Sequence, residues 1–268
     1  MRGENKFSSR HIIVTFICAI IGILLIWLGV SIDNSLFSNI GSVLLISGIY
    51  TVVDNMYLKK ALVEMVVQKV NLKKEINDTG LIKTGSVLSS IEYQEFLENA
   101  TSNIDIVHNY ARTWTDNNFE FVKNTVMNKN CQLRVVLLNP NSPFVPALSK
   151  HYKCTSEDLA GRIKDACNRW SDLYHDVGKK RKEHPNKSCG TVELYYFNGQ
   201  PTNSLYRIDN KLIVVTAKNS NAKSIYSPYA IYEQNDEKGL YNIYLNEIEA
   251  IINDATKVDL TAGNNFNM

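Results

Sequence analysis

The sequence predicts an α/β protein made of an N-terminal transmembrane helical hairpin and a cytosolic domain built around one mixed sheet. Two uncharged runs, residues 12–32 and 35–53, predict the hairpin, because each holds about 20 residues, enough to cross a bilayer. Beyond residue 80, short apolar runs typical of strands alternate with amphipathic stretches typical of helices, which predicts the mixed α/β domain. We expect four parts: a two-helix transmembrane region 1–54, a helical stalk 55–79, the α/β domain 80–257 and a loose tail 258–268.

Composition limits the classes of function. The 268-residue chain carries 29 Lys and Arg residues against 27 Asp and Glu residues, so its net charge does not indicate a nucleic-acid-binding protein. The five cysteines form no CxxC pair, and no histidine pairs with a cysteine or an acid at a spacing typical of metal sites. We therefore expect free thiols in a reducing compartment, no metal and no cofactor.

Positive charge around the two apolar runs predicts their orientation. Arg2, Lys6 and Arg10 precede the first run. The connecting turn holds Asp33 and no cation, whereas five lysines follow the second run. Because cationic flanks remain cytoplasmic, we expect a multi-pass protein of the bacterial inner membrane with both termini in the cytoplasm. A signal peptide is the alternative for the first run, but this run is too long for one and a second follows directly.

Small and polar residues of the second run fall largely on one helical face. They are Ser38, Asn39, Gly41, Ser42 and Gly48. Small residues let membrane helices approach closely, and amides bond across them, so we expect self-association through this face. The alternative is that these residues serve ordinary helix packing.

Apolar residues continue beyond the second run at a spacing typical of a short coiled coil. They are Leu58, Leu62, Met65, Leu72 and Ile76, and Lys69 occupies the remaining seam position. This pattern predicts a helical stalk that ends before residue 77. Together with the small-residue face, it favours a homo-oligomer, at least a dimer.

The predicted α/β domain contains a hairpin near its C-terminal end. We expect strands at 104–107, 132–138 and 192–196 and helices at 91–100, 118–127, 155–174 and 239–254. The apolar runs 205–208 and 212–215 flank Asp209-Asn210, a dipeptide that suits a tight turn.

The polar residues of this hairpin repeat the spacing of a catalytic motif, HxKxxxxD followed after six residues by GSxN. The register here is Thr202-x-Ser204-x-x-x-x-Asp209, six residues, then Thr216-Ala217-x-Asn219. Asp209 and Asn219 match the motif in residue type. The hairpin and the elements around it, over about residues 80–255, resemble one unit of the phospholipase D family.

This resemblance implies a phosphodiester-cleaving site in which a histidine attacks phosphorus and a lysine neutralises phosphate charge. Thr202 and Ser204 stand in those two places, and no histidine lies nearby in the sequence to activate a hydroxyl. We therefore expect a pseudoenzyme with no catalytic residue, in which Thr202, Ser204, Asp209 and Asn219 line a ligand site. The alternative is that Asp209 serves only the turn.

Another candidate ligand site follows the first strand of the domain. His108 and Arg112 come directly after the predicted strand 104–107, and ligands often bind at strand ends in α/β sheets. Helix capping or packing is the alternative role for these residues. The basic segment 179–187 is a further candidate surface for anions, although such segments are usually solvated loops.

A second segment, His151-x-Lys153-x-x-x-x-Asp158, has the literal HxKxxxxD spacing. However, Thr155 and Asp158 fit a capping box that opens the following helix, and no GSxN segment follows.

Two hypotheses about function follow. In the first, the chain resembles two-helix membrane effectors of bacterial anti-phage, abortive-infection defence. Its phospholipase D-like domain would then sense a nucleotide, nucleic-acid or protein trigger without enzymatic activity, and its helices would disrupt the lipid bilayer of the inner membrane. In the second, it is a membrane-anchored phosphodiesterase, nuclease or phospholipase that uses His151. An assay of phosphodiester hydrolysis with His151→Ala as a control separates the two.

Overall fold

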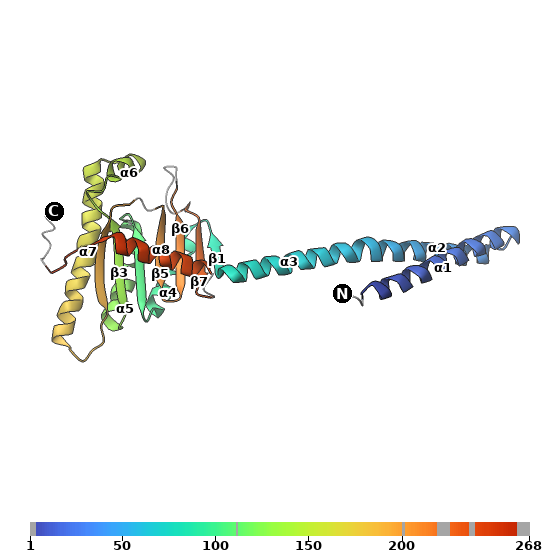
Figure 1. Ribbon diagram of the computed structural model, residues 1–268, viewed down its shortest axis with the longest axis horizontal. Coiled ribbons are helices and arrows are strands. Elements are labelled where there is room, and N and C mark those ends of the chain that lie inside the picture. Colours follow the sequence, from blue (N-terminus) through green and yellow to red (C-terminus); the bar gives the residue numbers. More distant parts are fainter. Residues whose placement is uncertain (1–3, 111, 200–201, 219–225, 236–238, 262–268) are drawn as a thin grey trace. The chain divides into compact units, whose positions relative to one another are not determined.

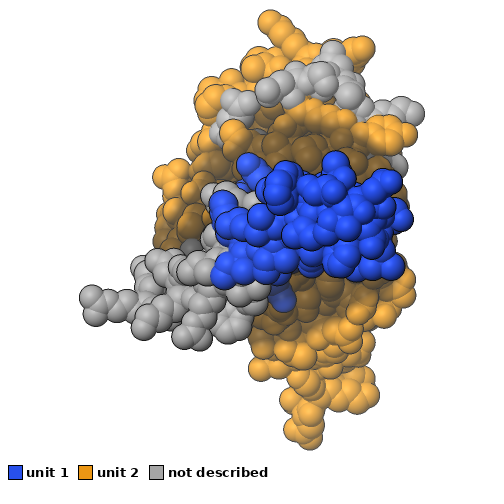
Figure 2. Space-filling model, turned by 90° about the vertical axis from the view of Figure 1, so that its right-hand side faces the viewer, with its two compact units in different colours: residues 1–74 blue, residues 75–268 orange. Residues whose placement is uncertain are grey.

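The protein is described from a computed structural model, which describes residues 4–110, 112–199, 202–218, 226–235 and 239–261. The chain divides into two compact units, residues 1–74 and 75–268, which Figure 2 colours separately.

The first unit is helical. Its elements are α1 (Glu4–Ser31), α2 (Ser35–Val53), a π-helical turn (Asp54–Leu58) and α3 (Lys59–Thr79), which continues into the second unit. The turn between α1 and α2 is short because Asn34 caps α2: its side chain accepts a hydrogen bond from the Leu36 N–H at 3.0 Å. The Asp33 backbone has a φ of +52°, a conformation that Asp adopts more readily than most residues.

The predicted transmembrane hairpin is corrected by the structure. Among the residues whose placement is described, no helix is both long enough and apolar enough to cross a membrane. The same finding contradicts the predicted membrane-spanning topology and the predicted inner-membrane localisation.

The small-residue face of α2 packs against α1 of the same chain. A Cβ atom at Gly41 would lie 2.6 Å from the Gly22 carbonyl oxygen and 2.7 Å from Ile26 Cγ1, so the two backbones meet at a distance that only glycine permits. Gly48 lies against Thr15 and Ala19, also in α1. In the same helix, the Ser42 hydroxyl donates to the Ser38 carbonyl at 2.9 Å, and Asn39 is exposed. Helix packing within the chain is therefore one role of this face.

The second unit is built on one mixed sheet. The strands are β1 (Leu81–Gly85), β2 (Asn103–His108), β3 (Gln132–Leu138), β4 (Thr191–Phe197), β5 (Asn203–Ile208), β6 (Lys211–Thr216), β7 (Tyr229–Glu233) and β8 (Thr256–Lys257). Their order across the sheet is β1-β7-β6-β5-β2-β3-β4-β8. The pairs β2–β3 and β3–β4 are parallel, because a helical crossover separates the strands of each pair, and the other pairs are antiparallel.

Helices cover both faces of this sheet (Figure 1). They are α4 (Tyr93–Asn99), α5 (Arg112–Asn128), α6 (Val145–His151), α7 (Ser156–Glu183) and α8 (Leu240–Asp254), with a 3₁₀ turn at Leu88–Ser90. The larger core lies between the sheet and α4, α5 and α7, where Trp170 of α7 is fully buried. The smaller core lies between the opposite face and α8, around Tyr241 and Ile248. Alternate residues of the strands point into the two cores.

A buried ionic network joins the sheet to α8. The carboxylate of Asp105, on β2, is 1% exposed and accepts hydrogen bonds from Arg134 Nε (2.6 Å) and Nη2 (2.9 Å) and from Arg207 Nη1 (2.9 Å). Arg134 also donates to the carboxylate of Glu249 on α8 at 2.6 and 2.9 Å. The network therefore ties three neighbouring strands to the helix that covers them.

The local predictions for the second unit are confirmed. The predicted strands correspond to β2, β3 and β4, and the hairpin is β5–β6, in which Ile208 pairs with Lys211 around Asp209-Asn210. The mixed α/β sheet domain is likewise as predicted. The helix expected at 155–174 extends to Glu183, so part of the segment 179–187 is helical rather than a loop. The sequence analysis missed β1, β7, β8 and α6, which are short.

Candidate functional site

The turn of the β5–β6 hairpin and its open end lie at opposite ends of the strands of the sheet. Val107 of β2 pairs with Leu205 of β5, so Ser204 lies near the C-terminal end of β2. Asp209 instead lies beside the start of β2, where its N–H donates to the Asn103 carbonyl at 2.9 Å. Five residues of extended chain separate Ser204 from Asp209, about 16 Å at strand spacing. Ser204 and Asp209 therefore do not share one site; Asn219 lies outside the described residues.

Asp209 stabilises the chain segment that leads into β2. One carboxylate oxygen accepts from the N–H groups of Ser102 (2.9 Å) and Asn103 (2.8 Å), and the other accepts from the N–H (2.8 Å) and hydroxyl (3.0 Å) of Thr101. Burial raises the pKa of Asp209, but these hydrogen bonds outweigh burial and hold the pKa below its ordinary value. Its backbone has a φ of +49°, as the turn requires. These contacts support a structural role for this residue.

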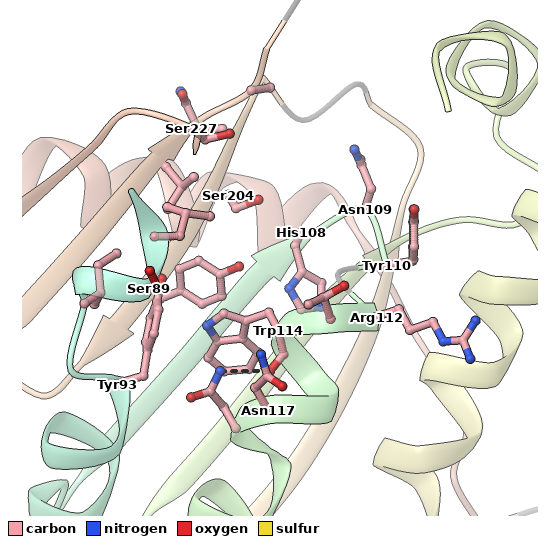
Figure 3. Close-up of a pocket in the computed structure, with 18 of the residues that line it drawn as sticks. Ser89, Tyr93, His108, Asn109, Tyr110, Arg112, Trp114, Asn117, Ser204 and Ser227 are labelled. Carbon is pink, nitrogen blue, oxygen red and sulfur yellow. Dashed lines mark hydrogen bonds between the residues drawn. The ribbon is translucent and has the colours of Figure 1, made fainter. Parts of the chain in front are cut away.

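A cavity of about 1230 Å³ lies at the opposite end of these strands from Asp209 (Figure 3). Its walls come from the α4 segment, the end of β2, the start of α5, the α6–α7 connection and the ends of β5 and β6 that lie away from Asp209. The parallel strands β2 and β3 end on this side of the sheet, which is where ligands commonly bind in α/β folds. Ser204 and Thr216 contribute to the lining. Thr202 is exposed, and its carbonyl accepts from the Ala217 N–H at 3.1 Å.

Four aromatic rings pack together at the wall of this cavity. Trp114 and Tyr206 are stacked with ring centroids 4.7 Å apart. Tyr93 meets both rings edge-on at 5.5 Å, and His108 meets both at 6.1 Å. Tyr206 is buried, whereas Trp114 is half-buried, so Trp114 is the more accessible ring of the stack. Burial raises the pKa of both tyrosines, which are therefore neutral phenols at pH 7.

Several buried polar atoms around this cavity have no hydrogen-bond partner. In the part of the chain that the structure describes, eight buried side-chain nitrogen and oxygen atoms lack a hydrogen bond, and five of them belong to residues that line the cavity. These five are Tyr93 Oη, His108 Nδ1, His108 Nε2, Asn109 Oδ1 and Trp114 Nε1. His108 is 1% exposed, and burial lowers its pKa to about 3, so its imidazole is neutral at pH 7. Folded proteins satisfy most buried polar groups, so this concentration is unusual.

Cationic side chains line another part of the cavity. Arg112 begins α5, and Arg162 and Lys153 approach from α7 and the α6–α7 connection. Arg112 makes a long contact of 3.8 Å with Asp116, and Tyr110 raises the pKa of Arg162 by accepting a hydrogen bond. In Figure 3, Tyr93 and Trp114 lie on one side of His108, and Tyr110 and Arg112 lie on the other. The aromatic and cationic parts of the cavity are therefore adjacent but distinct.

The structure gives different roles to the residues of the segment with the literal HxKxxxxD spacing. Asp158 forms the predicted capping box: its N–H donates to Thr155 Oγ1 at 3.1 Å, and its carboxylate accepts from the Thr155 N–H at 3.3 Å. His151 ends α6, and Lys153 follows with a φ of +55°. Both line the cavity, so the structure brings His151 and His108 to the same cavity while Asp158 caps α7.

The sequence analysis found part of this site. His108 and Arg112 were expected at a strand end and do line the cavity. The contributions of Tyr93 and Tyr206 were missed, because each looks like an ordinary core residue of its own element. A group of His, Cys, Asp and Glu side chains placed to hold a metal ion is not found among the described residues.

Comparisons with known proteins place the fold only broadly. No protein-family model and no curated protein matches the sequence. The solved structures that resemble the chain include these three. TrmBL2, an archaeal chromatin protein, is 12% identical, with a TM-score of 0.38 over 80% of this chain and 70% of that chain. Nuc from Salmonella typhimurium, a phospholipase D family member, is 10% identical, with a TM-score of 0.35 over 66% of this chain and 96% of that chain. A phosphatidylserine synthase from Haemophilus influenzae is 11% identical, with a TM-score of 0.36 over 67% of this chain and 40% of that chain.

The phospholipase D family is thus represented among the structures that this fold resembles. At identities near 12% and TM-scores below 0.5, the likeness does not assign an activity. The site must therefore be interpreted from its own geometry.

Proposed function

We propose that the second unit binds a small anionic ligand in the cavity at the ends of β2 and β5, and that it does so without hydrolysing it. The observation that carries this proposal is the group of three cationic side chains in the cavity lining, Arg112, Lys153 and Arg162.

The charges around the cavity favour a negatively charged ligand. The backbone N–H groups in the first turn of α5 have no partner within the helix and carry its positive dipole end. Arg112 lies in that turn, and Arg162 and Lys153 line the same cavity. Acidic residues also line it, at Glu92, Glu95 and Glu98, but they belong to the α4 segment rather than to the start of α5. An anion is therefore best accommodated at the α5 end.

The chemistry of the lining argues against hydrolysis. Ser204, which stands where the phospholipase D motif has lysine, is a neutral side chain that supplies no charge to a phosphorane-like transition state. His108 is neutral, and no carboxylate hydrogen-bonds to either of its nitrogens to orient the ring. A histidine that acts as a general base is usually oriented by such a group.

The test is direct binding of ribose 5-phosphate to the purified full-length chain by isothermal titration calorimetry. We expect measurable binding that weakens about tenfold or more in Arg112→Gln and Arg162→Gln, because each loses a charge-assisted bond. Lys179→Gln, an exposed cation on α7 whose contact with Glu183 is 3.9 Å, serves as the matched control and should bind like the wild type. Equal affinity in all four proteins, or no binding in any, contradicts the proposal.

One observation favours a second candidate, a phosphodiesterase: His108 and His151 line the same cavity. We expect the purified chain to leave bis-p-nitrophenyl phosphate intact. Turnover that His151→Ala or His108→Gln abolishes would replace binding by catalysis as the function of this cavity. The hypothesis of a defence effector that disrupts a membrane is not carried forward, because it depended on two membrane-spanning helices.

A further inference from the structure

We propose that the ligand of this cavity carries a planar heteroaromatic ring beside its anionic group, as a nucleotide does, and that Trp114 stacks on this ring. The inference rests on the proposed function, because it names the class of ligand that the same cavity takes. It is carried by the aromatic wall, which the requirement for an anion does not explain.

The first step concerns the stack of rings. Tyr206 lies beneath Trp114 with centroids 4.7 Å apart and planes 23° from parallel. Both rings line the cavity, but Tyr206 is only 4% exposed, whereas Trp114 is half-buried. The stack therefore ends at Trp114 on the cavity side. A flat ring that enters the cavity continues a stack that the protein has already begun, at no cost in ordering the indole.

The second step concerns the hydrogen-bonding groups around that stack. A base edge carries donors and acceptors in one plane, so its recognition requires both kinds of group beside an aromatic face. Gln94 and Asn117, which are exposed and line the cavity, each offer an amide N–H donor and a carbonyl acceptor. A simple phosphate or sugar phosphate leaves these donors and acceptors unused.

The third step concerns size and arrangement. The cavity volume of about 1230 Å³ exceeds the roughly 300–1,000 Å³ of ordinary ligand pockets. Figure 3 shows Arg112 on the opposite side of His108 from Tyr93, with Asn117 beside the Trp114 indole. A ligand with a ring at one end and a phosphate at the other matches this division between an aromatic wall and a cationic rim.

The experiment compares AMP, GMP, CMP and UMP with ribose 5-phosphate in calorimetric titrations of the full-length chain. Stacking of a base on an aromatic side chain corresponds to roughly 5- to 150-fold in affinity, so at least one nucleotide should exceed ribose 5-phosphate by that factor. In Trp114→Leu this preference should disappear while the affinity for ribose 5-phosphate stays unchanged, which also shows that the variant is folded.

Asn117→Ala provides a milder test, because it keeps the aromatic rings and removes only an exposed amide beside the Trp114 indole. We expect its affinity for the preferred nucleotide to fall about fivefold and its affinity for ribose 5-phosphate to stay constant. Equal binding of ribose 5-phosphate and all four nucleotides overturns the ring inference and leaves anion binding in place. Absence of binding by every compound overturns both, and a nucleotide preference that survives Trp114→Leu overturns the role of Trp114.

Discussion

At the scale of single residues, the same side chain can satisfy a catalytic motif and yet hold the fold together. Asp209 matches the phospholipase D spacing, but its carboxylate accepts four hydrogen bonds from the segment 101–103, at the edge of the sheet away from the cavity. His108 shows the reverse case. It looks like a buried core histidine, yet both of its nitrogens lack partners and it lines the cavity.

Asp209→Ala should therefore lower stability and leave ligand binding unchanged. We expect a loss of about 3 kcal/mol in the free energy of unfolding, because three backbone N–H groups lose a charged acceptor and Ala disfavours a φ of +49°. Urea denaturation measures the loss, and calorimetry with ribose 5-phosphate measures binding. Asn210→Ala, in the same turn, is the control and should cost under about 1 kcal/mol. Weaker binding by a folded Asp209→Ala protein would show that Asp209 contributes to ligand binding.

At the scale of secondary-structure elements, the sheet and α8 are joined by charge as well as by apolar packing. Arg134 bridges Asp105 within the sheet and Glu249 on α8, and its hydrogen bonds lower the pKa of Glu249. The hydrogen bond to Asp105 is the main cause that raises the pKa of Arg134 itself. Because Asp105 is almost fully buried, its charge depends on Arg134 and Arg207 for compensation.

Arg134→Met should destabilise the protein by about 3–5 kcal/mol, since it leaves the Asp105 carboxylate buried with Arg207 as its remaining cation. Lys179→Met is the matched control, because it breaks an exposed pair with Glu183 at 3.9 Å. That variant should stay within about 0.5 kcal/mol of the wild type in urea denaturation. Equal losses in the two variants would show that the network contributes no more than an exposed ion pair.

At the scale of the whole molecule, α3 presents a row of exposed apolar side chains at coiled-coil spacing. Leu62, Met65 and Leu72 are each more than half exposed, and Ile76 continues the row. The predicted homo-oligomer would cover this row with the same row of a second copy, in which Lys69 occupies the one polar seam position.

Lys69→Leu should therefore strengthen self-association, because it replaces a charged seam residue by an apolar one. Multi-angle light scattering over a concentration series should show dissociation of the oligomer at lower concentration in this variant than in the wild type. Lys74→Leu places the same side chain off the seam and serves as the control. A monomeric mass for all three proteins at micromolar concentration would refute association through α3.

The sequence by itself determined the features that depend on neighbours along the chain. The strands β2, β3 and β4, the β5–β6 turn at Asp209-Asn210 and the capping box of Thr155 and Asp158 follow from local spacing, because side-chain alternation and cap hydrogen bonds act within a few residues. Only the tertiary structure decided which of these residues share a site. It placed Asp209 against the segment 101–103 and Ser204 beside the cavity, because β5 pairs with β2 and its two ends meet opposite ends of that strand. It also brought Tyr93, His108, Trp114 and Tyr206 together from four elements, since packing across a sheet depends on distances in space that spacing along the chain does not encode.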